Sequence, residues 1–207
     1  IAMVGPPSQK NDAASQAYTV RASGANMWAG SDEFHFAWKK LKGDFILQAR
    51  VELLGPGVDP HRKLGVMVRR TLDADSAYAD AVAHGDGLTS LQFRRTPGAE
   101  TEQIVSEVKG ADVLQLERKG NRYTLRAARF GEPLAVSELD DLALGDEVHV
   151  GLFLCSHNPD VVERAIFRDV SERMRSDQLI RERESELQLT SRLAAMGGLA
   201  AGVGHEL

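Results

Sequence analysis

Alternation of apolar and polar side chains dominates the chain between residues 18 and 170. In residues 45–53, apolar side chains occupy every second position, and mostly polar side chains lie between them. A period of two places the apolar side chains on one face of a β-strand. The segments 63–70, 88–95, 112–119 and 122–129 follow the same pattern. We therefore expect each of them to be a strand with one buried face.

A short turn and a segment that is apolar on both faces add to the prediction of β-strands. Gly120-Asn121 is a two-residue connection between two of these strands, which predicts a β-hairpin. Residues 148–155 are apolar on both faces apart from His149, which indicates an interior strand, and residues 165–170 give a final strand. Roughly a dozen short strands separated by turns predict a mainly β fold, an antiparallel β-sandwich of the jelly-roll type.

The pattern changes after residue 170. Residues 171–188 contain no Gly or Pro and carry dense mixed charge, as in an exposed or paired helix. Apolar residues then recur with spacings of 4, 3, 4, 3 and 4, at Leu189, Leu193, Met196, Ala200, Val203 and Leu207. This is the pattern of a helix in a coiled coil or bundle. We expect a linker over 1–16, a sandwich over 17–170 and a long C-terminal α-helix, with a charged part over 171–188 and a bundle part over 189–207.

Composition narrows the function classes. The formal net charge of -5 argues against bulk nucleic-acid binding, which requires a basic face. Cys155 is the only cysteine, so the chain has no disulfide framework and no cysteine-based zinc site. No run approaches the roughly 18 apolar residues that span a bilayer. We expect a globular domain without nucleic acid as a partner.

Two tryptophans are the candidate binding residues of the sandwich. Trp28 and Trp38 could stack on a sugar ring, as aromatic side chains of lectin-like sandwiches often do. Trp38 shares a strand face with Phe34 and Phe36, which favours a place in the core. Trp28 and Trp38 are therefore weak candidates for a ligand site.

Other polar residues give weaker signals. Asp73, Asp75 and Asp86 occur near turns, but their spacing is not that of a calcium-binding EF-hand loop, and solvated turns explain them. Three histidines, His61, His84 and His157, also fall in predicted turns. No HxH or HExxH spacing occurs, so we expect no metal site.

Framework strands resemble the concanavalin-A-like sandwich family, which occurs in some glycosidases and in many bacterial multidomain proteins. The stretches are DEFHFAW (32–38), GDFILQARV (43–51), KLGVMVRR (63–70), LQLERKGNRYTL (114–125) and VGLFLCSHN (150–158). The resemblance covers about residues 15–170 and includes no catalytic signature. Members usually carry a tryptophan in the strand after KGNRYTL, where this chain reads ARFGEPLAV. The resemblance implies the fold rather than a site based on that tryptophan.

The C-terminal residues 192–207 (RLAAMGGLAAGVGHEL) resemble the H-box of the dimerisation helix of sensor histidine kinases. The matching positions are Leu193, Gly197, Leu199, Ala200, Ala201, Gly202, His205 and Glu206. The resemblance implies that His205 is the phosphoacceptor and that Glu206 orients its ring or acts as an acid or base. Gly204 departs from the pattern, because alanine is more usual there.

This second resemblance gives the leading hypothesis for the function. It implies part of a two-component sensor histidine kinase, in which the sandwich is an input domain and residues 171–188 are a signalling helix. His205 would be phosphorylated from ATP and Mg²⁺ by a domain absent from this chain, and would pass the phosphate to the receiver domain of a response regulator. The chain itself would need no cofactor and would form a homodimer through its C-terminal helix.

The charged segment after the sandwich bears on the location of the protein, and a second function is also possible for the sandwich. The charged residues 171–188 leave no membrane crossing between the sandwich and His205, so the resemblance implies a cytoplasmic sandwich, with any membrane attachment upstream of residue 1. The alternative is a lectin-like module that binds a carbohydrate or a protein and dimerises through a helical tail. The sequence does not name the ligand of the sandwich.

Overall fold

The structure is a computed structural model that describes residues 8–12, 17–169, 183–184 and 187–188. Its contacts divide the chain into two units, residues 1–169 and 170–207. The elements defined in the described residues are thirteen β-strands, all in the first unit. Every strand pair in that unit is antiparallel.

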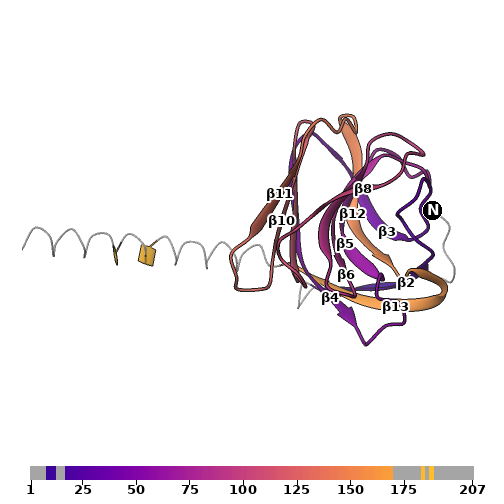
Figure 1. The fold of residues 1–207 in the computed structure, drawn as a ribbon, viewed down its shortest axis with the longest axis horizontal. Coiled ribbons are helices and arrows are strands. Elements are labelled where there is room, and N and C mark those ends of the chain that lie inside the picture. The colour runs from indigo at the N-terminus through magenta and orange to yellow at the C-terminus, as the bar shows by residue number, and fades with distance from the viewer. Residues whose placement is uncertain (1–7, 13–16, 170–182, 185–186, 189–207) are drawn as a thin grey trace, which may run out of the picture. The chain divides into compact units, whose positions relative to one another are not determined.

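One layer is a seven-stranded sheet (Figure 1). Its strands in spatial order are β1 (Ser8–Asp12), β2 (Ala17–Gly24), β13 (Asn158–Arg168), β4 (Phe45–Leu54), β9 (Val113–Lys119), β10 (Arg122–Ala128) and β11 (Ala135–Leu139). β9 and β10 form the hairpin predicted at Gly120-Asn121, and Gly120 has the positive φ of 60° that such a turn favours. β1 lies within the segment expected to be a linker.

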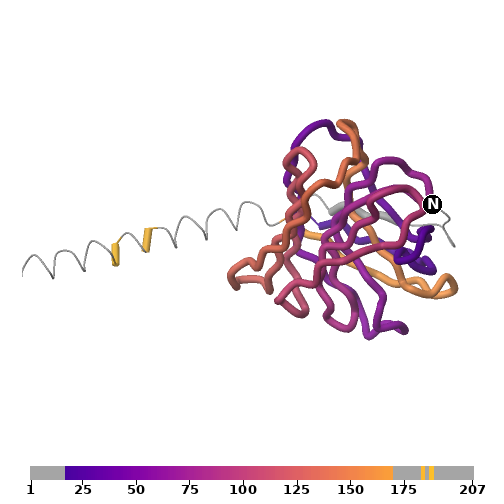
Figure 2. Tube along the Cα trace, turned by 45° about the horizontal axis from the view of Figure 1, so that its top comes forward, coloured from indigo at the N-terminus to yellow at the C-terminus, as the bar shows by residue number. Residues whose placement is uncertain are grey.

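The other layer is a six-stranded sheet, and Figure 2 follows the chain through both layers. Its strands in spatial order are β3 (His35–Lys42), β12 (Glu147–Cys155), β5 (Lys63–Arg69), β6 (Tyr78–His84), β7 (Thr89–Arg94) and β8 (Glu102–Val105). β12 pairs with both β3 and β5, so the doubly apolar segment is an interior strand, as predicted.

The main core fills the space between the two sheets. Alternate residues of β5 (Leu64, Val66 and Val68) pack in one cluster with Ala49 and Val51 of β4, and all five are at most 4% exposed. The alternation of apolar residues therefore correctly predicted the inner faces. The prediction of a mainly β, antiparallel sandwich of two sheets is confirmed, and the arrangement is consistent with a jelly roll.

A second apolar cluster covers the outer face of the six-stranded sheet. Met27 and Phe34, from the segment of residues 24–34, pack with Met67 of β5, Tyr78 of β6 and Phe153 of β12. We call residues 24–34 the covering segment. Because it lies over this face, β5, β6 and β7 are buried on both faces along their whole length.

Trp38 corrects a prediction about the core. Phe34 and Phe36 are buried, but Trp38 is 44% exposed and contacts the ring of His149 edge-on, with ring centroids 4.6 Å apart. Trp38 lies on β3, the edge strand, on the outer face of its sheet. Sharing a face with buried aromatics did not make Trp38 a core residue, because that face is covered only in part.

The predicted C-terminal helix falls almost wholly outside the described residues. Residues 183–184 and 187–188 have helical backbone, but no helix is defined in the described part of the chain. His205 and Glu206 lie outside the described residues. Within the described residues, no helix is long and apolar enough to cross a membrane.

Candidate binding site

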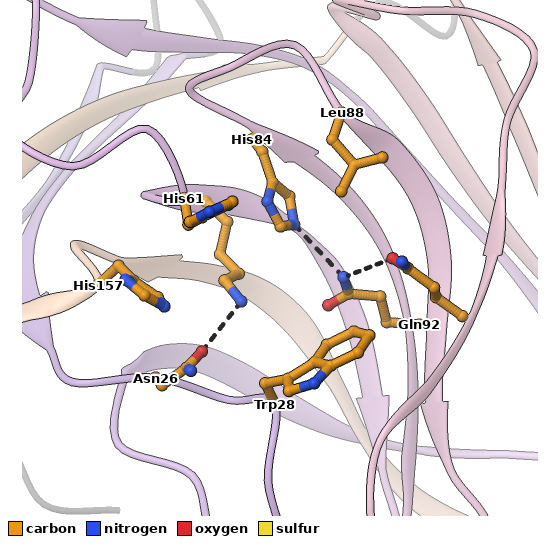
Figure 3. Close-up of a pocket in the computed structure, with 9 residues that line it drawn as sticks. Asn26, Trp28, His61, His84, Leu88, Gln92 and His157 are labelled. Atoms are coloured by element: carbon orange, nitrogen blue, oxygen red, sulfur yellow. Dashed lines mark hydrogen bonds between the residues drawn. The ribbon is translucent and has the colours of Figure 1, made fainter.

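A pocket opens on the outer face of the six-stranded sheet (Figure 3). Its cavity has a volume of about 270 Å³. The residues that line it are Asn26, Trp28, His61, Lys63, His84, Leu88, Gln92, Gln103 and His157. This volume is slightly below the roughly 300 Å³ at which small-molecule pockets usually begin. The pocket therefore suits a single ring-sized group.

Strand register brings four of these residues together. Lys63 begins β5 and lies opposite His84, which ends β6. Gln92 of β7 lies opposite Gln103 of β8. Side chains directly opposite in an antiparallel pair share a face and lie close together. Four neighbouring strands thus provide one polar surface.

The covering segment supplies the opposite wall. Asn26 pairs with Glu33 in an isolated β-bridge, and its side-chain oxygen accepts a hydrogen bond of 2.8 Å from the backbone of Met27. The backbone N–H of Thr101 donates to the carbonyl of Trp28 at 3.0 Å. Trp28 is 37% exposed, and its ring lies across the cavity from His84 (Figure 3). An apolar ring is therefore held in place and available to a ligand.

Three histidines from distant parts of the sequence meet at the pocket. The ring of His61 lies 6.2 Å from that of His84 and 5.5 Å from that of His157, centroid to centroid. His61 is in the connection between β4 and β5. There the neighbouring Arg62 forms a buried ion pair of 2.7 Å with Glu163. His157 Nδ1 lies 3.2 Å from the carboxylate of Asp59, outside the pocket lining. The loops that carry these rings are thus fixed.

His84 is a neutral hydrogen-bonding group. Burial lowers its pKa to about 3, with a further contribution from Lys63. Gln92 Nε2 lies 3.4 Å from His84 Nε2 and donates to Gln103 Oε1 at 3.3 Å. If Gln92 donates to His84 Nε2, the proton of the neutral ring is on Nδ1. Within the described residues, His84 Nδ1 and Gln92 Oε1 have no hydrogen-bond partner. One donor and one acceptor are therefore left unsatisfied in this wall.

Lys63 is a buried cation with few partners. The residue is 2% exposed, and burial lowers its pKa below the ordinary value. An ammonium group has three N–H donors. The structure gives Lys63 one hydrogen bond, of 3.2 Å, to Asn26 Oδ1, and no ion pair among the described residues. Most of its hydrogen-bonding capacity is unused.

A buried ionic network holds the covering segment to the sheet. Asp32 of that segment accepts hydrogen bonds of 2.6 Å from Arg69 of β5 and of 2.6 and 2.8 Å from Arg94 of β7. The three side chains are fully buried. Arg94 also donates to the carbonyl of Ala29. The network fixes the part of the chain that carries Asn26 and Trp28.

The structure separates the two candidate tryptophans. Trp28 lines the pocket, whereas Trp38 does not. Of the acidic turn residues, Asp73 and Asp75 precede β6 and Asp86 follows it, so they do not share a site. Within the described residues, no group of three or more His, Cys, Asp or Glu side chains is placed to hold a metal ion.

Sequence reasoning missed most of the pocket. It assigned the three histidines to turns, although His84 is the last residue of a buried strand, and it did not single out Lys63 or Gln92. The histidines are separated by 23 and 73 residues, so no local motif exists. The available signal was topological, because all three lie at strand ends or in connections.

Comparisons with known proteins give the fold. No protein-family model matches the chain, and no curated protein matches it. A functionally unknown protein from Saccharomyces cerevisiae superposes with a TM-score of 0.58 at 16% identity, over 80% of this chain and 90% of that one. The carbohydrate-binding module CBM66 from Bacillus subtilis gives 0.52 at 14% identity, over 81% and 91%. The GH43 protein BlXynB from Bacillus licheniformis, as its K247S mutant, gives 0.50 at 12% identity, over 72% and 31%.

These findings overturn the identification as a fragment of a sensor histidine kinase. The defined elements of the described residues are all β-strands, the similar structures include a carbohydrate-binding module, and no kinase is among these neighbours. The predicted coiled coil is withdrawn with it. The match rested on sixteen residues rich in Leu, Ala and Gly. A short segment of such restricted composition resembles many unrelated helices.

Proposed function

We propose that this protein is a carbohydrate-binding module with a concanavalin-A-like, jelly-roll fold, and that the pocket at Trp28 is its sugar site. The fold similarity to CBM66, whose name describes a carbohydrate-binding module, supports the class of function. At 14% identity the similarity concerns the fold, and fold alone does not define a function. The residues of the pocket have to carry the argument.

The observation that carries the proposal is the combination of Trp28 with unsatisfied polar groups opposite it. A sugar ring has an apolar C–H face, which stacks on an aromatic ring, and hydroxyl groups at its edge, which both donate and accept hydrogen bonds. Trp28 offers the aromatic face. His84 and Gln92 line the cavity, and His84 Nδ1 and Gln92 Oε1 have no hydrogen-bond partner among the described residues. Such orphaned groups are costly unless a ligand or water satisfies them.

The chemistry of the lining favours binding over hydrolysis. Most glycoside hydrolases use a pair of carboxyl groups on either side of the scissile bond. None of the nine lining residues is Asp or Glu. The pocket can therefore hold a sugar but lacks the usual acid and nucleophile or base.

Binding to a panel of soluble and insoluble polysaccharides tests the proposal. We expect retention of the wild-type protein on at least one polysaccharide. Retention should be lost in Trp28→Ala, because the sugar ring is expected to stack on the aromatic face of this side chain. Trp38→Ala is the matched control, since Trp38 is similarly exposed but lies outside the pocket. Equal retention of the two variants, or binding to no polysaccharide, would contradict the proposal.

A further inference from the structure

Lys63 gives the pocket a feature that a neutral sugar does not require. Its ammonium group lines the cavity, is 2% exposed and has one hydrogen bond, to Asn26 Oδ1 at 3.2 Å. A buried charge is strongly disfavoured unless it is paired and hydrogen-bonded. Two of its three N–H donors have no partner in the described residues. The unused donors call for an acceptor inside the cavity.

None of the residues that line the cavity provides a carboxylate for those donors. Of the nine lining residues, five are neutral, three are histidines, and the ninth is Lys63. Asp59 and Asp86 lie beside the pocket, but they are partly exposed and face His157 and His61. Each already accepts a backbone hydrogen bond, from His61 and Leu88 respectively. Neither forms an ion pair with Lys63.

Other buried charged groups lie on the same strands, outside the lining of the pocket. Arg69, Arg94 and Lys63 are three buried cations, against the two carboxyl groups of Asp32 and Asp80. Asp32 is shared by both arginines. Burial raises the pKa of Asp80 well above its ordinary value, which favours the neutral acid.

We propose that the pocket recognises an acidic sugar, with the carboxylate or sulfate group of the ligand accepting hydrogen bonds from Lys63 while its ring stacks on Trp28. The inference rests on the proposed function and specifies its ligand class. Lys63 provides the charge-assisted hydrogen bonds, which are shorter and stronger than neutral ones. His84 and Gln92 then bind hydroxyl groups of the same ring.

Matched sugar pairs test this inference on the whole chain. D-glucuronate and D-glucose differ at C6 alone, as do D-galacturonate and D-galactose, and galactose 6-sulfate extends the second pair. Dissociation constants are measured by NMR titration of the wild-type protein. We expect the acidic member of at least one pair to bind roughly tenfold to a hundredfold more tightly than the neutral member, as for one charge-assisted contact. Comparison of the affinities for the uronates and for galactose 6-sulfate identifies which acidic group the pocket prefers.

Two lysine variants connect the preference to the pocket. Lys63→Met should reduce the preference for the acidic sugar to about onefold. Lys40→Met is the matched control, because Lys40 is exposed on β3 and pairs with Glu147 outside the pocket. It should leave the preference unchanged. The ratio measured on the wild-type protein remains decisive if Lys63→Met does not fold.

The outcomes separate this inference from the proposed function. Equal affinities within every pair would overturn the inference and leave the sugar site standing. Binding of acetate or inorganic sulfate as tight as that of the acidic sugars would reduce the site to a simple anion site and overturn the inference. No binding of any sugar, acidic or neutral, would overturn both.

Discussion

Single buried polar residues define the character of the pocket. His84, Gln92 and Lys63 are each at most 8% exposed, yet each has hydrogen-bonding capacity that the described residues do not use. Unsatisfied buried polar groups cost free energy and are uncommon in native structures. Their convergence on one cavity is the reason to regard it as a binding site rather than as a gap in packing.

The buried ring of His84 predicts a dependence of stability on pH. Its pKa falls from 6.5 to about 3 on folding, mainly because burial disfavours the charged form. Between these values the unfolded chain binds a proton that the folded chain does not, so stability is fully present above pH 6.5 and falls as the pH falls. From pH 7 to pH 5, this residue should lower the free energy of unfolding by about 2 kcal/mol.

Urea unfolding of the wild type and of His84→Gln at pH 7 and pH 5 measures this contribution. The variant should lose less stability on acidification than the wild type. Some dependence should remain, because burial also lowers the pKa of His35. Identical losses in the two proteins would show that His84 is not held neutral by the fold.

At the scale of elements, the covering segment turns a sheet face into a site. Alternation in the sequence correctly indicated the strands and their inner faces. It also suggested that the polar positions of β5 and β7 face water, because charged residues are rarely buried. Arg69 and Arg94 are instead fully buried, since Asp32 pairs with both. Burial of that face depends on contacts 37 and 62 residues apart, which no local pattern contains.

Long separations in sequence also explain why the meeting of the histidines with Trp28 could not be predicted. Trp28 was identified as an aromatic side chain, but the other lining residues could not be identified from the sequence, because they come from four strands and four connections. Trp38 has the same chemistry and lies on an open edge strand. Residue type therefore predicted the kind of ligand contact, and the topology decided which tryptophan makes it.

Removal of the carboxylate that holds the covering segment tests the importance of this element. Asp32→Ala leaves two buried guanidinium groups without their ion pair and should lower the free energy of unfolding by about 3–5 kcal/mol. Asp140→Ala, which breaks an exposed pair with Arg122, should change it far less, because water screens that pair. Denaturant unfolding compares the two.

Ligand affinity gives this experiment a second measurement. Where Asp32→Ala remains folded, its affinity for the bound sugar should fall, because Asn26 and Trp28 lie on the released segment. Asp140→Ala should keep the wild-type affinity. Equal stability or equal affinity in the two variants would contradict the role assigned to the network.

At the scale of the whole molecule, the sandwich contains everything that the proposed function requires. Both apolar clusters and all nine lining residues belong to residues 1–169, one of the two units defined by contacts. The earlier hypothesis placed the function at His205, in the other unit. The function is now proposed for the sandwich.

A chain shortened to residues 1–169 tests this assignment. It should unfold at the same urea concentration as the sandwich of the full chain and should bind sugar with the same affinity, within about twofold, because no pocket residue is removed. Isothermal titration calorimetry and urea unfolding provide the two measurements. Loss of binding in a shortened chain that remains folded would show that residues 170–207 take part in recognition.

The central claim is that a sugar binds against Trp28, and the two tryptophans make it directly measurable. Each indole N–H gives one peak in a ¹⁵N-correlated NMR spectrum, and Trp28→Phe and Trp38→Phe assign the two peaks. On titration with the polysaccharide fragment or acidic sugar that binds, the Trp28 peak should shift saturably while the Trp38 peak stays in place. A shift confined to Trp38, or no shift of either peak at saturation, would contradict the account.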